Sequence, residues 1–227
     1  MAFSGFKPSF FKFFKELAAN NDKAWFEANR SRYESDVKDV LRDFVIAMGP
    51  KLTKISPNFV TDPKKSVFRI HRDVRFSKDK SPYKTNAGLQ FRHARGKDAH
   101  VPGFYLHLEP GQVFYGGGVW KPDAPALGRI RDAIVEKTKA WEKAKADKKV
   151  VAAFGDLREG DPLTRAPRGY DPDHPAVEDL KRRSFFVMKE NTQKAAGSAA
   201  FVDEVATTFA AAKPVLKFLT EAVGEEF

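Results

Sequence analysis

The middle of this chain alternates apolar and polar residues, and this alternation constrains the fold more than any other feature. It recurs in short runs at residues 68–76, 89–91 and 104–108, and residues 113–115 form another short apolar run. A period of two is typical of half-buried β-strands. Residues 109–112, with the sequence Glu-Pro-Gly-Gln, separate two of these runs and suit a tight turn. Because connections this short join antiparallel strands, we predict an antiparallel sheet between residues 66 and 120.

Helical patterns precede this central region. A first helix is indicated by Pro8 and by the apolar residues Phe10, Phe13, Phe14 and Leu17, which recur at helical spacing. The polar residues 20–22, Asn-Asn-Asp, interrupt this pattern and can cap a second helix. We expect this second helix to end at Gly49-Pro50, since proline is unfavourable inside a helix.

Further elements follow the strand region. Asp123 can cap a central helix that has Pro125 in its first turn. Residues 155–176 are rich in Gly, Pro and Asp, which predicts a long loop. Residues 184–189 read as a strand, and a closing helix is expected to be kinked or split at Pro214.

The chain has enough apolar residues to form one hydrophobic core. The chain has 227 residues, of which 42% are hydrophobic and 21 are Phe, so it is not a disordered chain. We therefore predict an α+β fold in a single domain, residues 1–227. In it, an antiparallel sheet of about five to six strands packs against N-terminal, central and C-terminal helices.

The residues and segments that the chain lacks limit the reactions it can catalyse and the cellular compartments it can occupy. The chain has no Cys, which excludes disulfides, thiolate nucleophiles and cysteine–zinc sites. Lys7, Lys12 and Lys15 interrupt the Phe-rich start, so we predict no signal peptide. No run reaches the roughly 18 apolar residues that a membrane span needs. We expect a cytoplasmic protein that does not enter a membrane.

Positive charge is concentrated in one part of the chain. The net charge is +10, and residues 61–100 hold eleven Lys and Arg against four Asp, a difference of +7. Within this region, residues 69–84 hold six basic residues against two Asp. Two like charges about 7 Å apart repel by roughly 2.4 kcal/mol at an effective dielectric constant near 20. The segment therefore favours an acidic partner.

One arginine in this segment is out of pattern. If residues 68–76 form a strand, one face is apolar except for Arg72, and the other face carries Arg69 and Arg75. A guanidinium on an apolar face needs a carboxylate, backbone carbonyls or a ligand. The alternative interpretation is a solvated strand face with one Arg that reaches to water.

These observations predict an anion-binding pocket. Three arginines would grip the anion, two lysines would add charge, and Tyr83 or Trp120 would stack on an apolar part of the ligand. Gly117, in a run of three glycines, could form the floor, with Lys121 at the rim. The predicted ligand-binding residues are Arg69, Arg72, Arg75, Lys80, Tyr83, Lys84, Gly117, Trp120, Lys121 and Lys181.

The same segment carries a resemblance to a known family. Residues 69–84 have the sequence RIHRDVRFSKDKSPYK, which resembles the signature of a widespread family of conserved hypothetical proteins, a domain of unknown function. The likeness extends to residues 20–26, 116–122 and 174–181. It implies a single-domain α+β protein and supplies no catalytic residues. His71 and Val74 stand where Asn and Thr are common in the family.

The sequence leaves three functions open. The first is binding of an anionic small molecule or phosphate group. The second is a nucleic-acid-binding module that adds Lys143, Lys145, Lys148 and Lys149 to the same basic segment. The third is a structural or interaction role in which the basic residues pair with the protein's own carboxylates. No cofactor or metal is predicted, and no oligomeric state is indicated.

Enzyme activity also stays open at this point. The sequence has neither HExxH nor GxSxG spacing, and no dense acidic cluster suits two-metal hydrolysis. His107 with Glu109, or His71 with Asp73, would share one strand face. Either pair could act as a base and the group that orients it.

Overall fold

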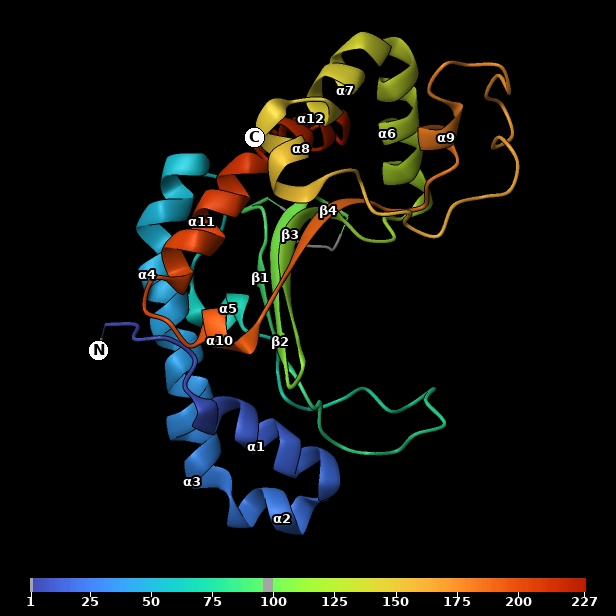
Figure 1. The fold of residues 1–227 in the computed structure, drawn as a ribbon. Coiled ribbons are helices and arrows are strands. Elements are labelled where there is room, and N and C mark those ends of the chain that lie inside the picture. Colours follow the sequence, from blue (N-terminus) through green and yellow to red (C-terminus); the bar gives the residue numbers. More distant parts are fainter. Residues whose placement is uncertain (1, 96–99) are drawn as a thin grey trace.

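The computed structural model describes residues 2–95 and 100–227. The α+β class is confirmed (Figure 1). The described residues form one antiparallel sheet of four strands in the order β1-β2-β3-β4. The strands are β1 (Ala87–Phe91), β2 (Gly103–Glu109), β3 (Gln112–Val119) and β4 (Phe185–Asn191).

The first half of the chain is largely helical. It contains α1 (Pro8–Ala19), α2 (Lys23–Ala28), α3 (Arg30–Arg32), a π-helical stretch (Tyr33–Lys38), α4 (Asp39–Ile55) and α5 (Pro63–Ser66). The predicted cap is present, because Asp22 accepts a hydrogen bond from the N–H of Trp25. The predicted end at Gly49-Pro50 is wrong, because α4 continues to Ile55. Leu52 and Ile55 beyond the proline are buried, and this burial offsets the missing backbone hydrogen bond.

The second half of the chain supplies the remaining helices. They are α6 (Ala124–Glu136), α7 (Thr138–Lys145), α8 (Lys148–Phe154), α9 (Val177–Leu180), α10 (Gln193–Ala196), α11 (Phe201–Ala211) and α12 (Lys213–Ala222). Asp123 caps α6 through the N–H of Ala126, as predicted. The predicted break at Pro214 separates α11 from α12. Residues 155–176 contain no helix or strand, which confirms the long loop.

The core lies between the sheet and the helices on one of its faces. Phe209 of α11 stacks on Phe104 of β2, with ring centroids 4.6 Å apart. Phe201 of α11 meets Tyr115 of β3, and α4 packs against α11 (Figure 1). The buried apolar residues form one cluster that extends from the N-terminal phenylalanines to α12.

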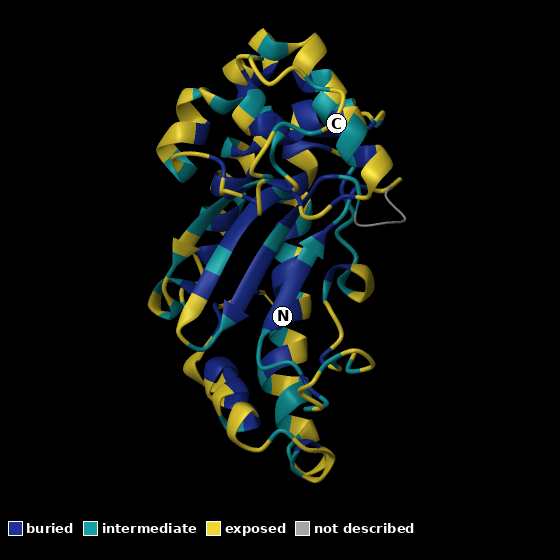
Figure 2. Ribbon diagram, turned by 90° about the vertical axis from the view of Figure 1, so that its right-hand side faces the viewer, coloured by how far each residue is buried: buried dark blue, intermediate teal, exposed yellow. Residues whose placement is uncertain are grey.

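The opposite face of the sheet is open. In the described part of the chain no helix lies over it, and Figure 2 looks directly onto this face. Helices α6 to α9 lie at one end of the sheet, and α1 to α3 with the basic segment lie at the other end (Figure 1). None of the helices in residues 2–95 and 100–227 has the length and apolar character that a membrane span requires.

The expected strand at residues 68–76 is not formed, which explains why the sheet has four strands. Phe68 donates its N–H to Gly88 of β1 at 3.0 Å, and His71 forms an isolated bridge with Tyr83. The chain then leaves the sheet as an extended loop. Phe76 is 96% exposed, so the expected apolar face does not exist there. Charges this dense are better solvated in a loop than in a paired strand.

Candidate anion-binding site

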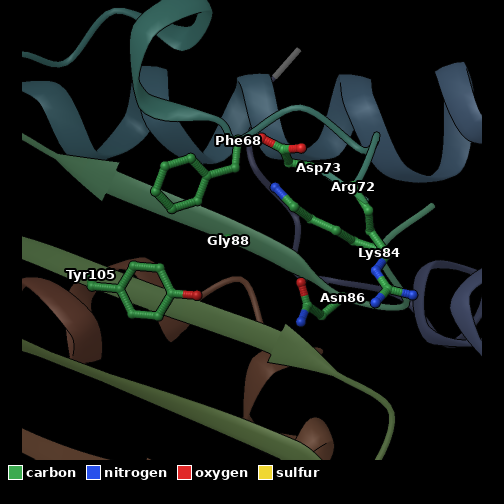
Figure 3. A pocket seen from close by; sticks show the side chains of 7 residues that line it. All are labelled: Phe68, Arg72, Asp73, Lys84, Asn86, Gly88 and Tyr105. Atoms are coloured by element: carbon green, nitrogen blue, oxygen red, sulfur yellow. The ribbon is translucent and has the colours of Figure 1, made fainter. Parts of the chain in front are cut away.

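A pocket of about 440 Å³ lies on the open face of the sheet, where the basic segment passes β1 and β2. Its lining residues come from three parts of the chain: Phe68, Arg72, Asp73, Lys84, Asn86, Gly88 and Tyr105. Figure 3 shows the long side chains of Arg72 and Lys84 reaching along one side of the pocket. Tyr105 lies on the other side, with its hydroxyl directed toward the space between them (Figure 3).

Two cations line the pocket, and Lys84 is the one that has no carboxylate partner among the described residues. Its ammonium donates to the carbonyl of Arg69 at 2.9 Å and lies 5.3 Å from the centroid of the Phe68 ring. Among the described residues no carboxylate lies within ion-pair distance of it. Burial, and then the charge of Arg69, lower the pKa of Lys84. A positive charge is therefore held in place without an ion-pair partner, because Asp73, which lines the same pocket, is engaged by Arg75.

Arg72 is held by the protein itself. Its guanidinium forms an ion pair with Asp79 and lies 3.5 Å from the hydroxyl of Ser77. Hydrogen bonds from the hydroxyl and N–H of Ser81, and then from Arg72, hold the pKa of Asp79 well below its usual range. Of the three partners that the sequence allowed for Arg72, the structure provides a carboxylate, and the arginine still lines the pocket.

The three other predicted cations of the basic segment point elsewhere. Arg75 makes a bidentate contact with Asp73, at 3.0 Å from Nε to Oδ1 and 2.7 Å from Nη2 to Oδ2. Its side chain is 76% exposed and does not line the pocket. Lys80 donates to the carbonyl of Val74 at 2.9 Å and closes the loop on itself. Arg69 contributes its carbonyl to Lys84, while its own guanidinium is exposed.

Tyr83 anchors the basic segment and lies outside the pocket. Its ring is 4% exposed and stacks on Phe26 of α2, with centroids 4.2 Å apart. The side chain of Asn21 accepts from the N–H of Tyr83 at 3.1 Å and donates to its carbonyl at 2.9 Å. The polar residues before α2 therefore fix the position at which residues 82–84 cross the molecule.

Gly117 faces the core. An added Cβ there would meet Leu216 of α12 at 2.8 Å and Phe104 at 3.0 Å. Its neighbours need glycine for another reason, because a Cβ on Gly116 would lie 1.9 Å from the carbonyl oxygen of Val187. The glycine run thus permits β3 and β4 to pair closely.

The three remaining predicted residues also lie outside the pocket. Trp120 packs edge-on against Phe186 of β4, at 5.2 Å between centroids. Lys121 lies over the ring of Trp120 at 5.6 Å. Lys181, which follows α9, forms an ion pair with Glu178 at 2.6 Å. The structure therefore brings together Arg72 and Lys84 from the predicted set, and it separates the others from them.

The sequence reasoning did not single out Tyr105, Asn86 or Gly88. Gly88 is required there, since a Cβ would lie 2.8 Å from the Phe68 ring and 3.0 Å from the Tyr105 hydroxyl. Burial, and then the charge of Glu109, raise the pKa of Tyr105 to about 12. The signal for Tyr105 was present, because Tyr105, His107 and Glu109 alternate along one strand and must share its face.

The predicted pairing of His107 with Glu109 is present. Nε2 of His107 lies 3.1 Å from Oε2 of Glu109, and Nδ1 lies 3.1 Å from the hydroxyl of Tyr105. His107 is 7% exposed and stacks on Phe114 of β3, with centroids 4.5 Å apart and an interplanar angle of 7°. Within the described residues, no group of three or more acidic or His side chains is arranged to hold a metal ion.

Comparison with known proteins gives one family. The model of a conserved hypothetical protein family, DUF2461, matches residues 9–218. A search of the curated proteins and a search of the solved structures each found no match. The matched region includes the basic segment, the pocket and the whole sheet. Because it covers most of the chain, the protein belongs to the conserved hypothetical protein family DUF2461.

Proposed function

We propose that this protein binds a small ligand with a phosphate or carboxylate group in the pocket between the basic segment and the sheet. The observation that carries the proposal is Lys84, whose half-buried ammonium meets a carbonyl and an aromatic ring, with no carboxylate partner in the described part of the chain. A unit negative charge about 4 Å away would attract it by about 4 kcal/mol at an effective dielectric constant near 20.

The charge balance of the segment supports the same proposal. Both aspartates of residues 69–84 are already engaged, Asp73 with Arg75 and Asp79 with Arg72. The other four cations, Arg69, Lys78, Lys80 and Lys84, have no carboxylate partner among the described residues. Arg69, Lys78 and Lys80 are exposed and solvated, whereas Lys84 is half-buried in the pocket, so Lys84 is the member of this excess that favours a bound anion.

The arrangement favours a small anion over a nucleic acid. The second basic segment, around α7, lies at the opposite end of the molecule from residues 69–84 (Figure 1). Within it, Lys145 is bound to Asp179 at 2.6 Å and to Glu142 at 3.0 Å. One continuous track for a phosphate backbone through both segments is therefore not supported.

The test is a titration of the purified protein with inorganic phosphate and, separately, with citrate, at constant ionic strength. We expect saturation at one equivalent. The affinity of Lys84→Gln for the same anion should be at least about tenfold weaker than that of the parent chain. Lys78→Gln is the matched control, because it removes the same charge from the same segment outside the pocket. An equal loss in both variants would indicate general electrostatic attraction, and no binding of either anion would overturn the proposal.

A further inference from the structure

A hydrogen-bonded chain of side chains runs along the open face of β2 and ends in the pocket. It passes from the hydroxyl of Tyr105 to His107 and from His107 to Glu109, with 3.1 Å at each step. The second carboxylate oxygen of Glu109 accepts from the hydroxyl of Thr85 at 3.3 Å. Three residues at every second position of one strand are thus connected into a single relay.

The partners fix the direction of this relay. A carboxylate can only accept hydrogen bonds, so Nε2 of His107 carries the hydrogen that faces Glu109. The other nitrogen, Nδ1, then has a lone pair and accepts from the hydroxyl of Tyr105. A proton can therefore move from Tyr105 to His107, and the imidazolium that forms would lie against a negative charge.

Only one end of the relay is open to the pocket. His107 is buried beneath Phe114 and does not line the cavity. Tyr105 lines the cavity opposite Lys84 and Arg72 (Figure 3). A ligand in the pocket would meet the phenol directly and would meet His107 and Glu109 only through it.

We infer that the pocket is a catalytic site, in which Tyr105 exchanges a proton with a bound substrate while His107 and Glu109 position and support it. This inference rests on the proposed function, because the substrate is held by the anion-binding groups. The chemistry fits a small carbonyl compound that also carries a phosphate or carboxylate group. Its reactive proton is on the carbon next to the carbonyl.

The step is balanced within the protein and the substrate. The carbon-bound proton passes to the oxygen of Tyr105 while the phenolic proton passes to Nδ1 of His107. The electron pair of the broken C–H bond forms an enolate, whose negative charge is attracted by the ammonium of Lys84, the same cation that holds the anionic group of the substrate. Return of a proton to the same carbon, from the phenol of Tyr105 as the imidazolium of His107 reprotonates it, restores the substrate and the neutral imidazole. The reaction class is therefore reversible enolisation, seen as exchange of the carbon-bound hydrogen, with no further reactant.

The experiment measures exchange of carbon-bound hydrogen for deuterium in D₂O by proton NMR. The probes are dihydroxyacetone phosphate, glyceraldehyde 3-phosphate, pyruvate and 2-oxoglutarate, each compared with heat-denatured protein. We expect the full chain to accelerate exchange in at least one probe. Tyr105→Phe should lower the rate at saturating probe by about a hundredfold or more. Tyr170→Phe is the matched control, because that phenol binds Asp132 on α6 and its loss should leave the exchange rate unchanged.

Two further measurements test the positioning residues. Nitrogen-detected NMR should find His107 protonated at Nε2 and accepting at Nδ1, and the opposite tautomer would overturn the relay. Glu109→Gln should lower kcat with little change in KM, and Glu109→Asp should restore part of it, whereas a merely structural role would not separate kcat from KM. If phosphate or citrate binds and no probe exchanges, this inference fails alone. If neither anion binds, the proposed function fails.

Discussion

Asn21 satisfies both backbone groups of Tyr83, although 62 residues separate the two in the chain. This contact ties the start of α2 to the end of the basic segment. Together with the stacking of Tyr83 on Phe26, it determines where Lys84 enters the pocket. The position of the pocket therefore depends on an asparagine that no ligand would touch.

We expect Asn21→Ala to destabilise the fold by about 2 kcal/mol, because two backbone groups of Tyr83 lose their partner. Chemical denaturation monitored by Trp fluorescence measures this. The neighbouring Asn20→Ala serves as the control, since among the described residues Asn20 bonds to α1 and to Asp22 just after it. Affinity for phosphate should also fall in Asn21→Ala, measured where the variant is fully folded. Unchanged affinity would separate this anchor from the pocket.

Asp79→Asn should strengthen anion binding. The substitution removes the carboxylate that is paired with Arg72, and the guanidinium becomes available to a ligand in the pocket. Because the carboxylate of Asp79 is largely exposed, we expect an increase of about two- to fivefold in affinity for phosphate. Calorimetric titration beside Asp36→Asn, a partly exposed carboxylate in the π-helical stretch and outside the pocket, provides the comparison. A lower affinity would mean that Asp79 positions Arg72 for binding.

We expect the free energy of unfolding to decrease at acid pH, in part because Asp179 becomes protonated. Burial pushes the pKa of Asp179 up, but hydrogen bonds from Lys145, Trp141 and Arg182 outweigh this effect and hold the pKa below its usual value of 3.8. A carboxyl group with a lowered pKa in the folded state stabilises the fold fully above that usual value. The stabilisation is then lost as pH falls through the pKa of the folded state.

The measurement for Asp179 is the free energy of unfolding between pH 6 and pH 2. We expect Asp179→Asn to cost about 3 kcal/mol near neutral pH, because the half-buried Arg182 loses its carboxylate and the half-buried Lys145 is left with the exposed Glu142. The variant should also show a smaller decline in acid than the parent chain. Asp132→Asn, whose carboxyl is exposed and bonds to Tyr170, is the control. Parallel acid profiles for the parent and Asp179→Asn would contradict the assignment.

Local sequence patterns were sufficient to predict several features of the fold. The caps at Asp22 and Asp123 and the break at Pro214 follow from side-chain chemistry within a few residues. The hairpin at residues 109–112 follows in the same way. The end of α4 did not follow, because burial of Leu52 and Ile55 against distant elements overrides the effect of Pro50. Local propensity is a weak term wherever tertiary packing competes with it.

The sequence by itself determined that a dense cluster of cations needs a partner, and it named Arg72 and Lys84 within that cluster. Only the tertiary structure decided which cations find one. The carboxylates of Asp73 and Asp79 lie within the loop, so they can neutralise the arginines that fold back onto them. Lys84 is placed by its pairing with Ile70 and by the anchor at Tyr83. It lies opposite Tyr105 and forms no ion pair with either aspartate, although Asp73 lines the same pocket. The physical reason is that the charge of a side chain follows from its residue type, whereas its neutralisation depends on how close the folded chain brings a carboxylate to it.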